Sequence, residues 1–367
     1  MLNNGCQGKF NEEIFVTRPY LPDLEEFKKG CEEIWKNRWL TNDGPMLHRF
    51  QHELAGYLGV EDSNLALFNN GTLALELGYY AMGLAGGDVI TTPFTFVATS
   101  HALKRIGATP VFADIDPATL CLDPARVEER ITPRTRAIVP VHVYGHACDV
   151  EGFDRLGEKY GIPVIYDAAH AFGTDLHRHG AMSMFSFHPT KLFHSCEGGC
   201  LVFRDSSLQP TLFNLRNFAI QNELECTDVG SNAKMNELQA LMGLECLKRI
   251  AELIDWRKRI QSAYMNAFAG SSVVSFPNLS LNGAYCPVLF RDYETRERVY
   301  AGLKARNVHA RRYFYPLLTD FAPYVYAHGS CPIAEDAASR ILALPTYHGL
   351  PLEIVSAIAR IVLELAE

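Results

Sequence analysis

Residues 162–170 read IPVIYDAAH, and residues 184–199 read MFSFHPTKLFHSCEGG. Each stretch begins with a short apolar run of strand length and passes into polar residues. Asp167 ends the first run, and Lys191 follows the second. In sheets of parallel strands, ligands bind beyond the carboxyl ends of the strands. We therefore expect both side chains to lie at a ligand-binding edge.

The rest of the chain extends this pattern. Further strands are expected at 89–92, 109–115, 136–144 and 199–204, with helices at 72–84, 96–108 and 149–161 between them. Such alternation is typical of an α/β fold with a mostly parallel sheet that helices cover on both faces.

The C-terminal third differs. Residues 238–270 have apolar positions at helical spacing and end in glycine, which predicts one long helical stretch. A smaller mixed region follows and ends in an amphipathic helix. We expect an N-terminal arm and a large α/β domain over 1–245, then a linking helix and a small α+β domain over 246–367.

Composition excludes several classes of protein. The 367 residues are 48% hydrophobic and 21% charged, as in a globular protein, and the net charge is -8. An acidic chain without a basic run argues against nucleic-acid binding. No apolar stretch reaches the roughly 18 residues of a membrane span, and the start MLNNGCQGKFNEE lacks a signal-peptide core. We expect a cytoplasmic protein without a membrane partner, whose ten scattered cysteines are free and buried.

The sequence LALFNNGT at 65–72 places Gly71 and Thr72 between a short apolar run and a helix. Free N–H groups and the positive dipole end of a helix suit a phosphate. Ordinary capping by Asn or Thr is the alternative interpretation.

The loop after Asp167 also contains His170. A carboxylate at this place can hold a cationic ring nitrogen, a metal or a sugar hydroxyl, and His170 can donate a hydrogen bond to the same ligand. A helix cap or ion pair for Asp167, and a structural role for His170, are the alternatives.

A sheltered Lys191 would have a lowered pKa and could form a Schiff base, although an exposed lysine is the alternative. Ser186 offers a hydroxyl to a phosphate. A phosphate cradle, a strand-end Asp and a strand-end Lys are together the three contacts that pyridoxal phosphate requires. Phe96 follows another expected strand and could cover the ring, unless it packs in the core.

Five motifs in order carry a resemblance to a known family. They are NGT (70–72), PFTFVAT (93–99), YDAAHA (166–171), SFHPTK with EGG (186–199) and SNAKMNELQA (231–240). This order resembles the DegT/DnrJ/EryC1/StrS sugar aminotransferases, and the resemblance extends from FVTRPYLPDLEEF at residue 15 past RRYFYPLLTDF at residue 311. It implies a fold-type I, aspartate-aminotransferase-like enzyme that uses pyridoxal phosphate.

The resemblance also implies a role for each matching residue. Lys191 would be the Schiff-base lysine, Asp167 would pair with the pyridine nitrogen, and His170 would lie near the ring hydroxyl. The phosphate would be bound by Gly71, Thr72 and Ser186. Phe96 would stack on the ring, and Asn232 would reach the phosphate from a second subunit. The last role implies a homodimer with shared active sites. The chain departs from many relatives at Ala181-Met182, where they carry an acidic residue.

Members of this family mostly transfer an amino group from glutamate to a ketone of a nucleotide-linked sugar. The segments VTRPYLP, LTNDGP and ARRYFYP are most similar to enzymes that act on dTDP-4-keto-6-deoxyhexoses, with dTDP-4-amino-4,6-dideoxyglucose as the expected product. Arg311, Arg312 and Tyr313 are candidates to bind the substrate. Amination at the third sugar carbon, and a GDP- or UDP-linked sugar, remain open. Because Lys191 is retained, the lysine-free dehydratases of the family are disfavoured.

Two other classes of function compete with this interpretation. HVYGHAC (142–148) and HSCEGGC (194–200) contain His and Cys, the ligands of zinc, but neither spacing matches a familiar zinc pattern, so we expect no metal. A regulator that binds pyridoxal phosphate without transamination is the non-enzymatic alternative.

Overall fold

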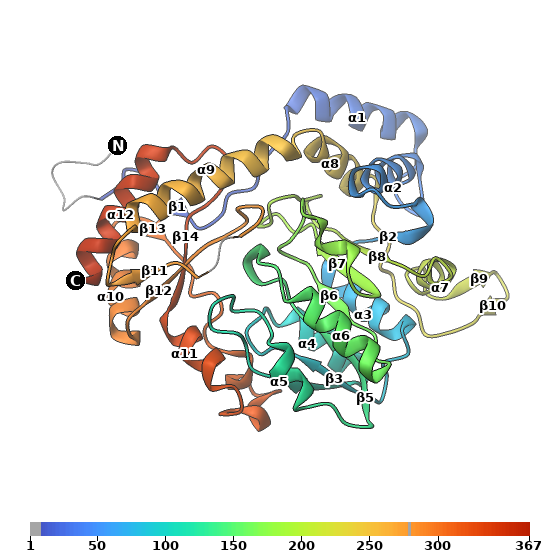
Figure 1. The fold of residues 1–367 in the computed structure, drawn as a ribbon. Helices are drawn as coiled ribbons and strands as arrows, with labels where there is room; N and C mark the ends of the chain where they lie inside the picture. Colours follow the sequence, from blue (N-terminus) through green and yellow to red (C-terminus); the bar gives the residue numbers. More distant parts are fainter. Residues whose placement is uncertain (1–8, 278–279) are drawn as a thin grey trace.

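A central sheet organises the large part of the molecule (Figure 1). The computed structural model describes residues 9–277 and 280–367. Hydrogen-bonded pairs and two parallel bridges, Ile138 to Val164 and Val141 to Asp167, give the strand order β2-β8-β7-β6-β5-β3-β4. β8 runs antiparallel to both of its neighbours, and the other strands run parallel to one another. In this order the strands are Leu65–Phe68, Gly199–Phe203, Met182–Ser186, Ile165–Asp167, Thr135–Val139, Asp88–Thr91 and Thr109–Phe112.

Both faces of this sheet are covered. In β2, Leu65 and Leu67 belong to one hydrophobic cluster, whereas Ala66 and Phe68 belong to another. Successive side chains of a strand point to opposite faces, so the two clusters are the two buried layers. The helices of this part are α2 (Pro45–Leu58), α3 (Gly71–Ala81), α4 (Ala98–Arg105), α5 (Pro124–Glu128), α6 (Val150–Tyr160) and α7 (Leu208–Leu215). The expectation of a mostly parallel, doubly covered sheet is confirmed.

Two expected elements differ most from the structure. The strand expected over 136–144 ends at Val139, because Pro140 has no N–H for the ladder and the chain then turns into a short 3-10 helix, Val143–Gly145. The helical stretch expected over 238–270 is wrong as one helix: it forms α8 (Glu237–Leu247) and α9 (Ile250–Phe268). The break follows from packing, since α8 contacts α1 (Leu24–Asn37) and α2 while α9 contacts α12 (Leu352–Ala366).

The C-terminal part is a smaller α+β assembly. Its antiparallel sheet has β12 (Cys286–Phe290) between β11 (Val274–Ser275) and β14 (Ile341–Leu344). The helices α9, α10 (Tyr293–Ala305), α11 (Pro332–Arg340) and α12 (Leu352–Ala366) belong to this part (Figure 1). An N-terminal strand, β1 (Ile14–Phe15), pairs with β13 (Val308–His309), so the start of the described chain joins this assembly. No sequence pattern predicts that pairing.

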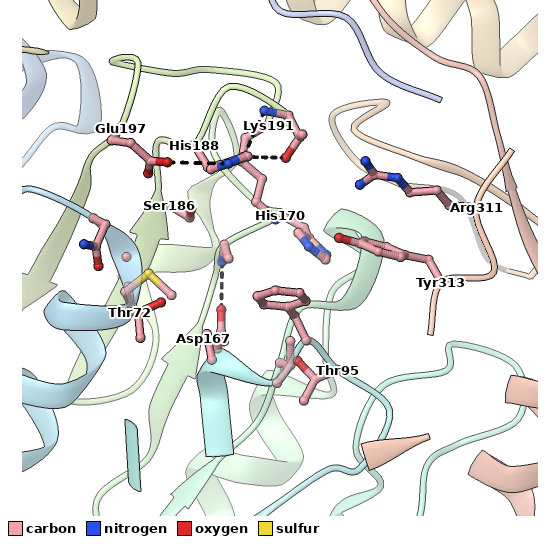
Figure 2. Close-up of a pocket in the computed structure, with 18 residues that line it drawn as sticks. Thr72, Thr95, Asp167, His170, Ser186, His188, Lys191, Glu197, Arg311 and Tyr313 are labelled. Atoms are coloured by element: carbon pink, nitrogen blue, oxygen red, sulfur yellow. Dashed lines mark hydrogen bonds and ion pairs between the residues drawn. The ribbon is translucent and has the colours of Figure 1, made fainter. Parts of the chain in front are cut away.

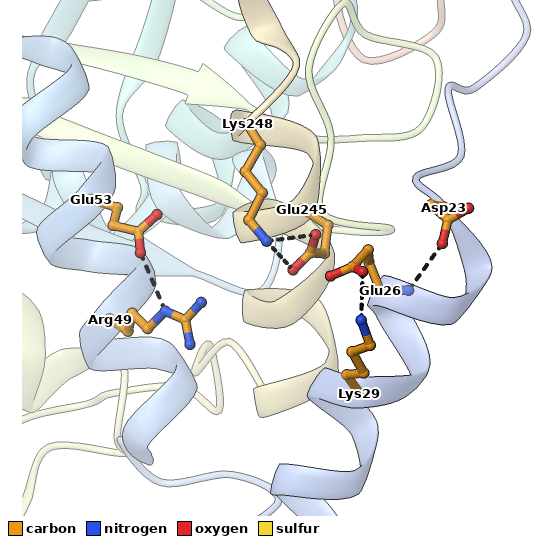
Figure 3. Close-up of polar contacts among 7 residues, drawn as sticks. All are labelled: Asp23, Glu26, Lys29, Arg49, Glu53, Glu245 and Lys248. Atoms are coloured by element: carbon orange, nitrogen blue, oxygen red, sulfur yellow. Dashed lines mark hydrogen bonds and ion pairs between the residues drawn. The ribbon is translucent and has the colours of Figure 1, made fainter.

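An outer layer of helices, α1 (Leu24–Asn37), α2 and α8, carries ion pairs between near neighbours in sequence (Figure 3). The side chain of Asp23 caps α1 by accepting from the N–H groups of Glu25 and Glu26. Exposed ion pairs within single helices join Glu26 to Lys29 and Arg49 to Glu53. A third pair joins the buried Glu245 to Lys248, the residue that follows α8. The two exposed pairs contribute only about 0–1 kcal/mol each, so they add little to the stability of this layer.

Within the described residues, none of the helices combines the length and the apolar character that a membrane crossing requires. The nine described cysteines are unpaired, as expected, but Cys196 and Cys226 are exposed and Cys31 is half-buried, which corrects the expectation of burial for these three. Cys6 and the rest of the segment 1–8 lie outside the described residues.

Candidate active site

A cavity of about 280 Å³ opens at the carboxyl ends of the parallel strands (Figure 2). It brings together nine of the residues that the sequence predicts: Gly71, Thr72, Phe96, Asp167, His170, Ser186, Lys191, Arg311 and Tyr313. Thr72 and Ser186 lie at one side of this cavity, and Arg311 and Tyr313 lie at the other (Figure 2). The cavity therefore has a hydroxyl-lined side and a side that carries the arginine.

The hydroxyl-lined side is built around the first turn of α3. The Asn70 side chain caps this helix by accepting from the Leu73 N–H at 2.9 Å. The N–H groups of Gly71 and Thr72 have no acceptor within the helix, because the Ala74 N–H donates the first intrahelical hydrogen bond, to the Asn70 carbonyl. The positive end of the helix dipole lies at the same place. Capping by Asn70 and anion binding by the next two residues are thus compatible, because they use different N–H groups.

Close backbone contact holds this turn against β7 and β8. A Cβ on Gly199 would lie 2.7 Å from both the Cα and the N atom of Gly71, and a Cβ on Gly71 would lie 3.1 Å from the Ser186 Cβ. The two glycines therefore allow Ser186 and the helix N-terminus to share one small anion cradle.

Replacing Gly199 by alanine is expected to lower cofactor affinity, because the new methyl group must push the N-terminal turn of α3 away from β8. Overpacking of this kind costs about 1–3 kcal/mol, or roughly 5- to 150-fold in affinity. Fluorescence titration with pyridoxal phosphate measures the change. Gly56→Ala is the matched control, since a Cβ at this position in α2 meets nothing within 4 Å. Equal affinity of Gly199→Ala and wild type would contradict the cradle.

Asp167 ends β6 and is buried. One carboxylate oxygen accepts from the Thr99 hydroxyl at 2.7 Å, and the other accepts from the Ala169 N–H at 3.0 Å. Burial raises the pKa of Asp167, while these hydrogen bonds and the charge of Lys191 oppose the rise. A buried carboxylate held in this way suits a cationic ring nitrogen. Thr99 was not singled out from the sequence, although it stands in the motif PFTFVAT.

Lys191 lies half-buried in the loop after β7. Burial lowers the pKa of its amine, the nearby Tyr313 and Asp167 raise it, and Arg311 lowers it. The Nζ atom lies 6.0 Å from the centre of the Tyr285 ring. A lowered pKa increases the fraction of neutral amine, the form that attacks a carbonyl carbon.

The surroundings of His170 determine its tautomer. Its Nδ1 accepts a hydrogen bond from the Tyr144 N–H at 3.1 Å. Burial, and then the charge of Lys191, keep the pKa of His170 well below its ordinary value. The neutral ring therefore carries its proton on Nε2 and can donate from that atom, as expected for a residue near a ring hydroxyl.

Phe96 is 51% exposed and lines the cavity, so the alternative of core packing is wrong. His188, Thr190 and Glu197 also line it, and no role was assigned to them from the sequence. The His188 Nδ1 lies 2.8 Å from the Thr190 hydroxyl, and its Nε2 lies 3.6 Å from the Glu197 carboxylate. These three residues lie in the same sequence motif as Lys191, and that position is the only feature of the sequence that could have indicated a place in the site.

Two predicted residues lie outside the cavity lining. The Arg312 guanidinium pairs with both carboxylate oxygens of Glu297 and stacks on the Tyr300 ring. This placement favours Arg311, and not Arg312, as the substrate-binding arginine. Asn232 is exposed, and its amide oxygen accepts from the Lys234 amine at 2.8 Å.

Three side chains of the two possible zinc motifs contact the backbone. His142 Nδ1 accepts from the Cys148 N–H, the Cys148 thiol donates to the Val141 carbonyl, and His194 Nε2 lies 2.6 Å from the Tyr20 carbonyl oxygen. Among the described residues, no group of three or more His, Cys, Asp or Glu is placed to hold a metal ion.

These residues fit pyridoxal phosphate. The glycine-lined cradle suits its phosphate, the buried carboxylate suits its pyridine nitrogen, and the amine with a lowered pKa suits its aldehyde. Together with the sheet order, this site defines an enzyme that depends on pyridoxal phosphate.

Comparison with known proteins specifies the class. A model of the DegT/DnrJ/EryC1/StrS aminotransferase family matches residues 23–363, and the chain belongs to this family. A dTDP-4-amino-4,6-dideoxy-D-glucose transaminase of Shigella dysenteriae is 42% identical over 366 residues, which cover 96% of this chain and 99% of the relative. A GDP-perosamine synthase of Caulobacter vibrioides is 33% identical, covering 92% of this chain and 94% of the relative. A crystal structure of DesI with its TDP-sugar product matches with a TM-score of 0.91 and 34% identity, covering 98% of this chain and 94% of DesI.

Proposed function

We propose that this aminotransferase moves the amino group of L-glutamate to the 4-keto carbon of dTDP-4-keto-6-deoxy-D-glucose and forms dTDP-4-amino-4,6-dideoxy-D-glucose. The observation that carries the proposal is the nearly full-length similarity to a transaminase with this product in its name. The match to DesI with a TDP-sugar product supports the same nucleotide. The 33% identical GDP-perosamine synthase makes a GDP-linked sugar the second candidate.

The residues of the cavity have separate tasks in this reaction. When bound, pyridoxal phosphate supplies an electron sink that stabilises negative charge at the amino-acid α-carbon. Gly71, Thr72 and Ser186 hold its phosphate, and Asp167 keeps its ring nitrogen protonated. The His170 Nε2–H donates toward the ring hydroxyl. Together these residues would hold the cofactor beside Lys191.

Lys191 performs the proton transfers in this proposal. Its neutral Nζ takes the proton from the α-carbon of glutamate as a general base and later returns a proton as a general acid. The same group serves both half-reactions, because the amino group enters from glutamate in the first and leaves to the sugar ketone in the second. Ping-pong kinetics follow from this sequence of events.

A homodimer completes the proposal. Asn232 lies outside the cavity of its own chain, on the exposed surface, so it is available to reach the phosphate of a second copy. Near this segment, α1 and the residues after it expose Trp35, Trp39 and Leu40. Exposed aromatic side chains on one layer are typical of a protein interface.

Complementation tests the shared site. Lys191→Ala removes the amine of one chain, and Asn232→Ala removes the phosphate contact that this chain gives to a second copy. Mixed dimers therefore regain one site with both groups, and their activity should exceed the mean of the two variants measured alone. Light scattering of the wild type is expected to give a mass near twice 41.0 kDa. A monomer with full activity would overturn the dimer proposal.

Absorbance of the holoenzyme tests the reaction itself. We expect a band near 420 nm that moves to about 330 nm when glutamate is added, as the cofactor accepts the amino group. Keto sugars linked to dTDP, GDP and UDP are then screened for restoring the first band, and NMR of the product identifies the aminated carbon. A band that responds to no amino donor would support the regulator instead.

The two neighbouring arginines should have separable effects. Arg311→Met removes a cation from the cavity, and a lost charged hydrogen bond of about 1.5–3 kcal/mol predicts a KM for nucleotide sugar or glutamate raised roughly 10- to 150-fold. Arg312→Met breaks the pair with Glu297 and should lower the melting temperature with little change in KM. Steady-state kinetics with each substrate varied in turn measures both effects. The reverse pattern would show that the substrate-binding assignment belongs to Arg312.

A further inference from the structure

The turn of residues 280–285 belongs to the C-terminal part of the chain but is buried beneath loops that line the cavity. Ser280, Asn282, Ala284 and Tyr285 are all buried, and Asn282 is 0% exposed. Only the Leu281 side chain of these five non-glycine residues points outward, with 47% of its surface exposed. The Leu281 N–H donates to the Gly145 carbonyl at 3.1 Å. A buried polar turn of this kind must satisfy its hydrogen bonds internally.

Both the nitrogen and the oxygen of the Asn282 side-chain amide form hydrogen bonds. Its Nδ2 donates to the carbonyl oxygens of His170 at 2.9 Å and Phe172 at 2.8 Å. Its Oδ1 accepts from the Ser280 hydroxyl at 2.8 Å and the Ala284 N–H at 3.0 Å. One side chain thereby joins the turn to the loop that follows Asp167.

The same turn reaches the other active-site loop. Arg257, buried in α9, donates to the Ala284 carbonyl at 3.0 Å and to the Lys191 carbonyl at 3.4 Å. The Tyr285 ring lies 4.6 Å from the His170 ring, centre to centre, and 6.0 Å from the Lys191 amine. The turn therefore contacts both the proton-transfer residue and the hydrogen-bond donor of the proposed mechanism.

We propose that Asn282 is a positioning residue, which holds the 280–285 turn so that Tyr285 shields the Lys191 amine and supports the His170 ring. The inference rests on the roles proposed above for Lys191 and His170. Asn282 does not line the cavity, so it acts through the turn and not by contact with substrate. Tyr285 covers the amine, and loosening the turn would admit water to it. The titratable or charged groups that face this amine are Asp167, His170, His188, Tyr285, Arg311 and Tyr313.

The test compares Asn282→Ala with the control Leu281→Ala, which changes the exposed side chain next to it. The first readout uses full-length protein freed of cofactor: limiting acetic anhydride labels Lys191 as a function of pH, and mass spectrometry of the peptide gives its titration midpoint. Because burial lowers the pKa of Lys191, added water in Asn282→Ala should raise this midpoint by about one pH unit. Leu281→Ala should leave it unchanged.

The second readout is kinetic. Misplacement of a reacting group by about 1 Å can cost roughly 100-fold, so kcat of the Asn282→Ala holoenzyme should fall about 10- to 100-fold with the KM for glutamate within about threefold. A folded Asn282→Ala with the wild-type midpoint and kcat overturns the proposal. If that variant does not fold, Tyr285→Leu keeps the Asn282 bonds and removes the ring: a raised midpoint supports the proposal, and an unchanged one overturns it. The labelling requires no turnover, so it separates this inference from a failure of the proposed reaction.

Discussion

The Lys191→Ala variant is expected to have no measurable multiple turnover and no band near 420 nm when pyridoxal phosphate is added. The amine lies at the cavity with a pKa that burial lowers, and the side chain of alanine can neither bind the aldehyde nor carry a proton. Loss of a positioned acid–base group alone costs about 10²- to 10⁴-fold in rate, and loss of the covalent attachment adds to this. Absorbance and a coupled assay for 2-oxoglutarate measure the two effects.

Lys159→Ala is the matched control, because Lys159 is exposed and pairs only with surface groups near α5 and α6. It should retain the wild-type spectrum and rate. Small primary amines added to Lys191→Ala should restore part of the turnover, since they can take the place of the missing amine. Sustained turnover of Lys191→Ala without any added amine would refute the assignment of this residue.

Replacing Asp167 by asparagine is expected to have the second-largest effect. The carboxylate is the buried anion that faces the proposed ring nitrogen, and breaking a buried charge pair costs about 3–5 kcal/mol. That free energy corresponds to roughly 10²- to 10⁴-fold in rate if it is lost mainly in the transition state. The measurement is the single-turnover rate with glutamate at saturating cofactor.

The same Asp167→Asn replacement, which lowers the rate, should not lower the stability of the cofactor-free protein. Burial raises the pKa of Asp167, so the folded chain keeps this proton to a higher pH than the unfolded chain does. The contribution of Asp167 to the free energy of unfolding is therefore present below the ordinary pKa of about 3.9 and is lost as pH rises through the raised value. Asp167→Asn has no such loss and should be at least as stable as wild type at pH 7, by urea unfolding without cofactor. A variant that is both less stable and fully active would contradict a cofactor-binding role.

Thr99 shows why some of the site escaped prediction. Asp167 and Lys191 could be identified because each follows an apolar run, and the end of a parallel strand is where ligands bind. Thr99 lies in a helix 68 residues before Asp167 and reaches it because β5 joins β3 to β6 in one continuous sheet. A hydrogen bond between distant segments leaves no local pattern. Asn282, 112 residues after His170, is a second case.

The local spacing of apolar residues was enough to predict most of the fold. Strand-length apolar runs predicted the parallel sheet and its helices, because residues buried on both faces of a sheet must be apolar wherever the chain crosses it. The motifs predicted the cofactor, since phosphate, pyridine nitrogen and aldehyde each require one kind of side chain. Long-range packing set what remained: the break between α8 and α9, the pairing of β1 with β13, and the choice of Arg311 over Arg312 at the cavity. The sequence alone does not distinguish two adjacent arginines. They differ in the structure because Glu297 on α10 binds Arg312.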